Sequence, residues 1–326
     1  MDQIDKDLLN ALQTSFPLDP KPFETLGKRL GISEDEVMAR VRNLKKSDLL
    51  RQISAIFDSA ALGYSSVLAA LRVDPEELDR AAAIVSRHRG VSHNYSRNHD
   101  FNLWFTLTVP PGQSADAEAD SLKKEAGAQA LRLLPTVRLF KIGVSFDMSE
   151  TGVASLPAAR TERPGRMELS EDDVKAIRAL QEDLPLESRP FERPAKRLGW
   201  SDDELLRRAR EYLDSGLMRR FAATLRHRNA GFSANAMGVW VVPEERAEEL
   251  GTIMSGFPAV SHCYQRPTYP DWPYSLFTMI HGRSKEECEG VARSISEATG
   301  ITEYRLLYSA KEYKKIRVRY FEEDAR

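Results

Sequence analysis

The chain has 326 residues, of which 41% are hydrophobic and 29% charged, and its formal net charge is -2. This balance is typical of a globular protein and excludes a disordered chain, while the length predicts two to four domains. No stretch approaches the roughly 18 apolar residues that cross a bilayer, and the N-terminus lacks the pattern of a secretory signal. Because two cysteines, Cys263 and Cys288, are too few for a disulfide framework, we expect a cytoplasmic protein.

Three short helices are predicted at the start of the chain. Ile4, Leu8 and Leu12 recur at helical spacing. A second helix runs through FETLGKRLG and ends at Gly31, and Ser33 is the expected N-cap of a third. Three helices with a glycine-containing turn are typical of a helix-turn-helix or winged-helix domain.

An α+β domain is predicted next. Four β-rich runs, RQISAIF, SSVLAALRV, VSHNYSR and LWFTLTV, alternate with two helical segments, PEELDRAAAIVSRH and ADAEADSLKKEAG. This succession indicates the βαββαβ order of a ferredoxin-like domain, to which we also assign the RQISAIF run that begins at Arg51.

The whole succession occurs twice. FPLDPKPFETLGKRLGISEDEV from Phe16 matches LPLESRPFERPAKRLGWSDDEL from Leu184, and VSHNYSR from Val91 matches VSHCYQR from Val260. The fold class is therefore α+β, a tandem repeat of a helix-turn-helix domain plus a ferredoxin-like domain. We predict helix-turn-helix domains at 1–50 and 167–218, ferredoxin-like domains at 51–149 and 219–326, and a linker rich in Ala, Pro and Gly at 150–166.

The arrangement resembles the Lrp/AsnC transcription regulators, whose αβ domains pair edge to edge. Three motifs sharpen the resemblance: HNYSRNHDFNLWFTL from His93, HCYQRPTYPDWPYSLFTM from His262, and RRFAATLRHRNAGFSANAMGVW from Arg219. They are similar to the siroheme decarboxylases, Lrp-like proteins of two related subunits, and the chain resembles their fused form. The resemblance implies conversion of siroheme to 12,18-didecarboxysiroheme by loss of two acetate carboxyls as CO2, toward heme d1 or heme. It implies no added organic cofactor beyond the iron-tetrapyrrole substrate.

Such a substrate needs cationic partners for its carboxylates, an apolar slot and acids that deliver protons where CO2 leaves. The repeated motif puts His93, Tyr95 and Arg97 at alternate positions of a strand, and therefore on one face. A histidine can either move a proton near neutral pH or ligate the substrate's iron, and both roles stay open. The second copy repeats this face with His262, Tyr264 and Arg266.

The two modules are chemically unequal. His99 belongs to the first copy only and His227 to the second only. With the two motif histidines and tyrosines, they complete the candidate catalytic residues. Arginines at the first strand of each αβ domain are further candidates for substrate binding, although they can equally bridge protein carboxylates: Arg51, Arg219 and Arg220. Two aromatic residues of the second motif, Trp272 and Tyr274, are also candidates for substrate binding, although they can equally belong to the core. Trp104 and Trp240 have the same two interpretations, and we expect His88 and His281 to be structural.

Two other functions compete. A fused Lrp-type regulator would place its third helices, SEDEVMARVRNLKKSD and SDDELLRRAREYLDSG, in the DNA major groove. Both helices begin with acidic residues that would face the DNA phosphates. Short basic runs such as RHRNAGF and KKIRVRY are usually solvated. DNA is therefore not expected as a partner. The second competing function is a heme-binding sensor without catalysis, which would use the same histidines as ligands. For assembly we expect an intramolecular pseudo-dimer of the two modules, with a further homodimer left open.

Overall fold

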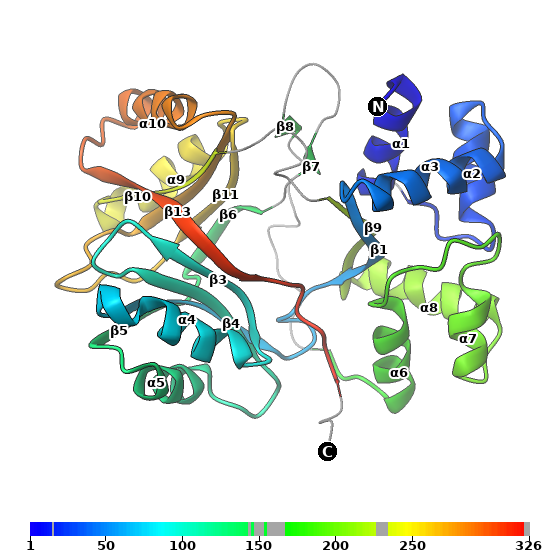
Figure 1. Cartoon of the computed structure of the whole chain (residues 1–326), viewed down its shortest axis with the longest axis horizontal. Helices are drawn as coiled ribbons and strands as arrows, with labels where there is room; N and C mark the ends of the chain where they lie inside the picture. Colours follow the sequence, from blue (N-terminus) through cyan, green and yellow to red (C-terminus); the bar gives the residue numbers. More distant parts are fainter. Residues whose placement is uncertain (15, 143–144, 147–152, 155–166, 226–233, 323–326) are drawn as a thin grey trace.

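The computed structural model describes residues 1–14, 16–142, 145–146, 153–154, 167–225 and 234–322. These residues form two parts, a sandwich of strands and helices and a separate helical unit (Figure 1). The C-terminal half of strand β13 runs from the first part toward the second. No helix within the described ranges is both long enough and apolar enough to cross a membrane.

The helical unit contains both predicted helix-turn-helix domains. Ser33 caps the third helix, its hydroxyl accepting from Glu36 N, and Ser170 forms a capping box with Asp173. Gly31 takes the left-handed conformation, φ 70°, that ends the second helix. The helices are α1 (Gln3–Thr14), α2 (Pro22–Leu30), α3 (Glu34–Lys46), α6 (Glu171–Leu180), α7 (Glu192–Arg197) and α8 (Asp202–Ser215).

Two strands that we assigned to the αβ domains belong instead to this helical unit. β1 (Leu50–Phe57) and β9 (Met218–Leu225) pair antiparallel with each other in a sheet of their own. One face of this sheet, including Ile53 and Phe221, joins the core formed by both sets of helices. The assignment of RQISAIF was wrong because the alternation of apolar residues shows that a strand has a buried face, but not which partner buries it.

Each αβ domain has the predicted βαββαβ order and packs two helices on the outer face of its sheet. The first domain consists of β2 (Ser65–Arg72), α4 (Leu78–Arg87), β3 (Val91–Arg97), β4 (Leu103–Val109), α5 (Ala115–Ala126) and β5 (Ala130–Leu134). The second consists of β10 (Ala234–Trp240), α9 (Ala247–Ser255), β11 (Val260–Gln265), β12 (Leu276–Gly282), α10 (Lys285–Thr299) and β13 (Tyr304–Lys315). Short 3-10 turns at Pro75–Glu77 and Glu244–Arg246 precede α4 and α9.

The two αβ domains pair within one chain by exchanging strands at their edges. The end of β13 pairs antiparallel with β3, and β6 (Arg138–Ile142), which follows β5, pairs with β11. The result is one nine-stranded sheet in the order β5-β2-β4-β3-β13-β10-β12-β11-β6. β7 (Ser145–Phe146), near the end of the predicted first αβ domain, pairs antiparallel with β8 (Val153–Ala154). β8 lies in the predicted linker, whose other residues are outside the described ranges.

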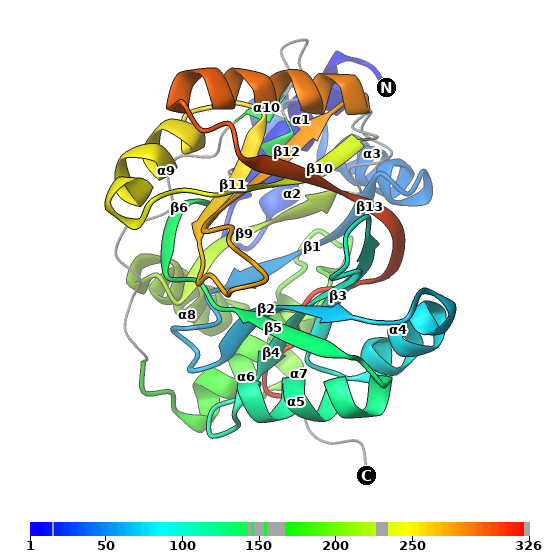
Figure 2. The same ribbon diagram turned by 90° about the vertical axis from the view of Figure 1, so that its left-hand side faces the viewer.

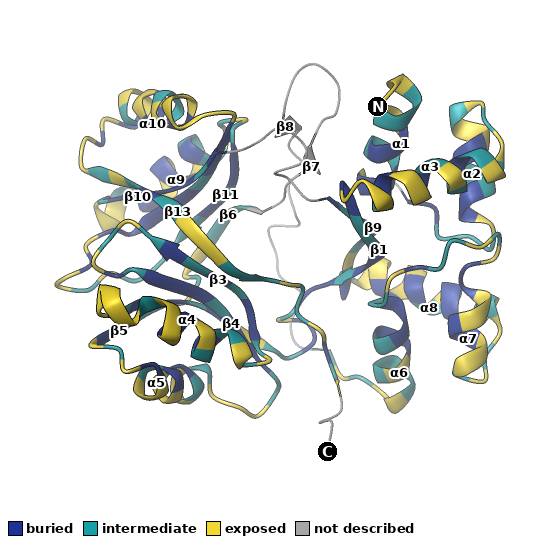
Figure 3. Ribbon diagram, in the orientation of Figure 1, coloured by how far each residue is buried: buried dark blue, intermediate teal, exposed yellow. Residues whose placement is uncertain are grey.

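The large sheet curves so that its two halves face each other, with α9 and α10 on one outer side and α4 and α5 on the other (Figure 2). Its strands are mostly buried, while the outer surfaces of the helices are exposed (Figure 3). Residues of both modules meet in the interior between the halves, among them Trp104, Met237, Trp272, Phe277 and Leu307. The inner face of the sheet therefore belongs to both modules.

Candidate active site

The His/Tyr/Arg face predicted for the first copy exists. Along β3, Asn94 points to the helix side, where its amide donates to Ala82 O of α4 at 3.0 Å. His93, Tyr95 and Arg97 alternate with it and occupy the inner face. The His93 and Tyr95 rings lie 6.2 Å apart, and the Arg97 guanidinium lies 5.9 Å from the Tyr95 ring centre.

The second copy reproduces this face on β11. The His262 and Tyr264 rings are stacked at 6.0 Å, and the Arg266 guanidinium lies 4.7 Å from the Tyr264 ring. Because β3 and β11 occupy equivalent places in the two halves of the sheet, both sets of three face the shared interior.

The arginine of each set donates a hydrogen bond to a backbone carbonyl of the opposite module. Arg97 Nη1 donates to the Leu307 carbonyl of the other module at 2.8 Å, and Arg266 Nη1 donates to the Leu134 carbonyl. Burial lowers the pKa of Arg97 to about 10. Each arginine thus ties its strand to a strand of the opposite module. We therefore expect a structural role for both arginines in place of the carboxylate binding that the motif suggested.

The opposite, histidine end of β3 is rich in positive charge. Lys315 of β13 pairs in register with His93, and Arg51 Nη1 donates to the Lys315 carbonyl at 3.2 Å. Burial, together with the charges of Lys315 and Arg51, lowers the pKa of His93 to about 4. The His93 imidazole is therefore neutral at pH 7 in the unliganded protein.

Further arginines extend this positive region onto the sheet of the helical unit. Arg317 Nη1 donates to Ser54 Oγ of β1 at 2.6 Å, and its Nη2 donates to Thr224 Oγ1 of β9. Burial and the nearby charges of Arg220 and Arg51 lower the pKa of Arg317 to about 10. We define Arg51, Arg220, Lys315 and Arg317 as the cationic cluster.

Two members of the cationic cluster were not predicted from the sequence, and one neighbouring arginine, which was predicted to bind substrate, has another partner. Lys315 and Arg317 lie in the KKIRVRY run, which we interpreted as solvated, but here the run crosses between the two parts of the molecule. Arg219 instead pairs with the buried carboxylate of Asp58, 2.7 Å away, which is the bridging role that we named as its alternative.

The remaining candidates lie at the arginine end. Trp272 is fully buried, and its ring lies 5.1 Å from His99 and 5.2 Å from Trp104. Tyr274 stacks edge-on to Trp272 at 4.9 Å, and burial lowers the pKa of His99. Trp104, Trp272 and Tyr274 form the interior core rather than an open slot. Trp240 belongs to the other core, between the second half of the sheet and helices α9 and α10. His227 lies outside the described residues.

One histidine that we expected to be structural adjoins the motif. His281 Nε2 lies 2.6 Å from Ser261 Oγ, which is 2.8 Å from His262 Nδ1. Burial and the charge of Lys315 lower the pKa of His281 to about 4. The charge of Lys315 therefore acts on both His93 and His281, and Ser261 connects His281 to His262. Their sequence positions carry no signal of this.

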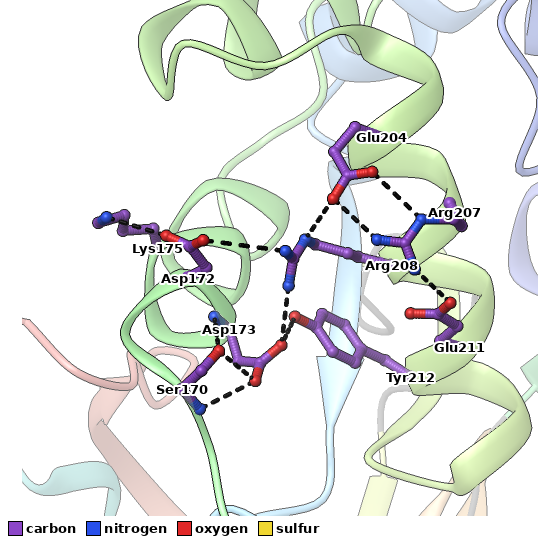
Figure 4. A network of polar contacts seen from close by, with 9 residues as sticks. All are labelled: Ser170, Asp172, Asp173, Lys175, Glu204, Arg207, Arg208, Glu211 and Tyr212. Carbon is purple, nitrogen blue, oxygen red and sulfur yellow. Dashed lines mark hydrogen bonds and ion pairs between the residues drawn. The ribbon is translucent and has the colours of Figure 1, made fainter.

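The third helices of the helical unit use their arginines for internal contacts. Arg208 of α8 binds Asp173 of α6 at 3.2 Å and Glu204 at 3.0 Å, and Tyr212 donates to the same Asp173 (Figure 4). In the first module Arg40 of α3 binds Asp5 of α1 in the equivalent way, at 2.8 Å. These guanidinium groups hold helices together and are not directed at a ligand.

Comparison with known proteins agrees with this architecture. The family model described as "AsnC-like ligand binding domain" matches residues 61–141 and 229–314. The model "Siroheme decarboxylase NirDL-like HTH domain" matches residues 5–51 and 173–219. Both modules are therefore matched in both of their parts.

Similar individual proteins carry the same name. A siroheme decarboxylase of Hydrogenobacter thermophilus is 41% identical over 318 residues, 97% of this chain and 95% of the relative. The siroheme decarboxylase beta subunit of Methanosarcina barkeri is 49% identical over 151 residues, 46% of this chain and 99% of that subunit. The crystal structure of the siroheme decarboxylase NirDL in co-complex with an iron-uroporphyrin III analogue superimposes with a TM-score of 0.77 at 36% identity, covering 98% of this chain and 95% of that one.

Proposed function

The chain belongs to the siroheme decarboxylase family, and we propose that it removes the acetate carboxyls at C12 and C18 of siroheme as CO2, giving 12,18-didecarboxysiroheme. Beside the family relationship, one observation carries the placement of the reaction: the partly buried His93 lies near the cationic cluster, where the sandwich meets the helical unit. The product would serve the synthesis of heme d1 or heme.

We place the substrate carboxylates at the cationic cluster. Siroheme carries many carboxylates, and guanidinium groups bind such anions through paired hydrogen bonds. Arg51 and Arg220 come from the sheet of the helical unit, Arg317 from the segment after β13, and Lys315 from β13 itself. A substrate held by all four would lie close to His93.

The chemistry needs a proton but no electron. In each step the bond between the acetate methylene and its carboxyl carbon breaks, CO2 leaves, and the electron pair stays on the methylene carbon. The conjugated macrocycle delocalises this pair until a proton reaches the carbon, which becomes a methyl group. Each lost CO2 therefore consumes one proton, and no added organic cofactor is required.

His93 is the proton donor that fits this step best. Its pKa is low because it is buried near Lys315 and Arg51. Substrate carboxylates that pair with these cations cancel their charge and thereby raise the pKa of the imidazole, so that it can hold a proton once substrate is bound. Binding then favours the protonated, acidic form of the histidine.

We further propose that the molecule works as a single-chain pseudo-dimer in the cytoplasm. The pairing of β13 with β3 and of β6 with β11 already joins the two modules. Cys263 and Cys288 are buried free thiols, which fits a reducing compartment.

Turnover tests the proposal and separates the enzyme from a sensor. The purified protein is incubated anaerobically with siroheme, and the pigment mass is followed. Two successive losses of CO2 are expected. A bound pigment of unchanged mass with a shifted Soret band would contradict catalysis and indicate a sensor or carrier.

A further inference from the structure

A serine connects two histidines of the second module. Ser261 Oγ lies 2.8 Å from His262 Nδ1 and 2.6 Å from His281 Nε2. On the far side, His281 Nδ1 lies 2.5 Å from Asn235 Oδ1. These four side chains form one hydrogen-bonded chain across β11, β12 and β10.

Donor and acceptor counting gives this chain a direction. Asn235 Oδ1 only accepts, so His281 carries its proton on Nδ1 and accepts at Nε2. The single Ser261 hydroxyl proton goes to that nitrogen, since its other acceptor, the Met279 carbonyl, is 3.4 Å away. Ser261 Oγ must then accept from His262 Nδ1. The low pKa of His281, caused by burial and Lys315, keeps it in the neutral form that this pattern requires.

The first module lacks the imidazole behind its serine. Ser92 Oγ contacts His93 Nδ1 at 2.9 Å, as Ser261 contacts His262. Thr108, however, stands where the second module has His281, and its hydroxyl donates to Ser66 Oγ at 3.0 Å. The motif histidines of the two modules are therefore held differently.

We propose that His281 is a positioning residue of the decarboxylation site, which acts through Ser261 to fix His262 as the Nδ1–H tautomer with its lone pair on Nε2. The catalytic consequence rests on the proposed function. An imidazole with a fixed Nε2 lone pair is in the form that takes up a proton or binds iron, and outer partners of this kind typically affect activity by about 10–100-fold.

The tautomer itself can be measured without substrate. The full chain is labelled with ¹⁵N-histidine, and two-bond ¹H–¹⁵N correlations report which ring nitrogen of His262 is protonated, its signals being assigned by their loss in His262→Gln. We expect Nδ1–H in the parent protein and a mixture of tautomers in His281→Phe and in Ser261→Ala. The Ser261→Ala variant retains the buried Cβ, so it provides the test if His281→Phe does not fold. Thr108→Val, the matched change in the first module, should leave the His262 signals unchanged.

Turnover of siroheme by the same variants tests the consequence. For Ser261→Ala and His281→Phe we expect kcat to fall about 10–100-fold with KM within about twofold, and for His281→Gln, whose amide oxygen can accept from Ser261, partial recovery. An unchanged tautomer and an unchanged kcat in Ser261→Ala would overturn the proposal. If the parent protein shows the Nδ1–H tautomer but releases no CO2, the proposed function fails while the positioning of His262 stands.

Discussion

Arg97 and Leu307 lie 210 residues apart in the sequence, and a 2.8 Å hydrogen bond from Nη1 to the carbonyl oxygen joins them. Arg266 and Leu134 form the symmetrical contact. Both bonds cross between the modules at the arginine end of the sandwich, away from the cationic cluster. The arginine of the repeated motif therefore joins the two modules, while the proposed function assigns the chemistry to the histidine of the same strand.

Replacing Arg97 with Met should therefore lower stability rather than substrate affinity. The variant leaves the Leu307 carbonyl without this donor, and hydrogen bonds to charged groups contribute about 1.5–3 kcal/mol. Urea unfolding should show a loss of that size, while the Kd for siroheme stays within about twofold. A large loss of affinity for siroheme at unchanged stability would instead show that Arg97 binds the substrate.

Replacing Lys315 with Met should weaken substrate binding and raise the pKa of His93. Lys315 contributes a positive charge beside both His93 and His281 and would pair with a carboxylate of the substrate. We expect KM for siroheme to rise about 10-fold, equivalent to one charge-assisted hydrogen bond. NMR titration should show the pKa of His93 moving toward 6.5. Lys311→Met, which removes a surface pair with Asp79, is the control and should change neither value.

Mild acid should destabilise the folded protein through His93 and His281. Both have a pKa of about 4 when folded, against 6.5 for an ordinary histidine. Below pH 6.5 these histidines bind protons in the unfolded chain but not in the folded protein, so the free energy of unfolding decreases as the pH falls from 6.5 to 4. The slope is up to about 1.4 kcal/mol per pH unit for each histidine. The stability difference between pH 7 and pH 5 should be smaller in His281→Gln, and an equal difference would refute this account.

The helix-turn-helix domains should act as scaffold and not bind DNA. Arg208 is tied to Asp173 and Glu204, and Arg40 to Asp5. We expect Arg208→Met to lower the melting temperature of the protein by several degrees, because a partly buried charge network loses its centre. Parent protein and variant should both leave a DNA duplex unshifted in a gel at physiological salt. Salt-sensitive, Arg208-dependent DNA binding would be the contrary result.

Local patterns predicted most of the fold and half of the site. Caps such as Ser33 and Ser170 and the alternation His93, Tyr95, Arg97 depend on neighbouring residues, so the sequence contains them directly. The β1–β9 sheet and the exchanged strands depend on pairing across more than a hundred residues, which periodicity does not specify. Lys315 and Arg317 of the cationic cluster and His281 were missed for the same reason, since their importance comes from contacts between elements.

The most direct test of the account is siroheme turnover by a variant that lacks both motif histidines, His93→Gln with His262→Gln. General acid catalysis by a positioned side chain typically contributes about 10²–10⁴-fold, so the double variant should lose at least 100-fold in kcat. His88→Gln, which alters a histidine near Glu118 outside the site, should retain the parent rate. Loss of two CO2 molecules by the double variant at the parent rate would contradict the placement of the active site at the histidine end of the sandwich.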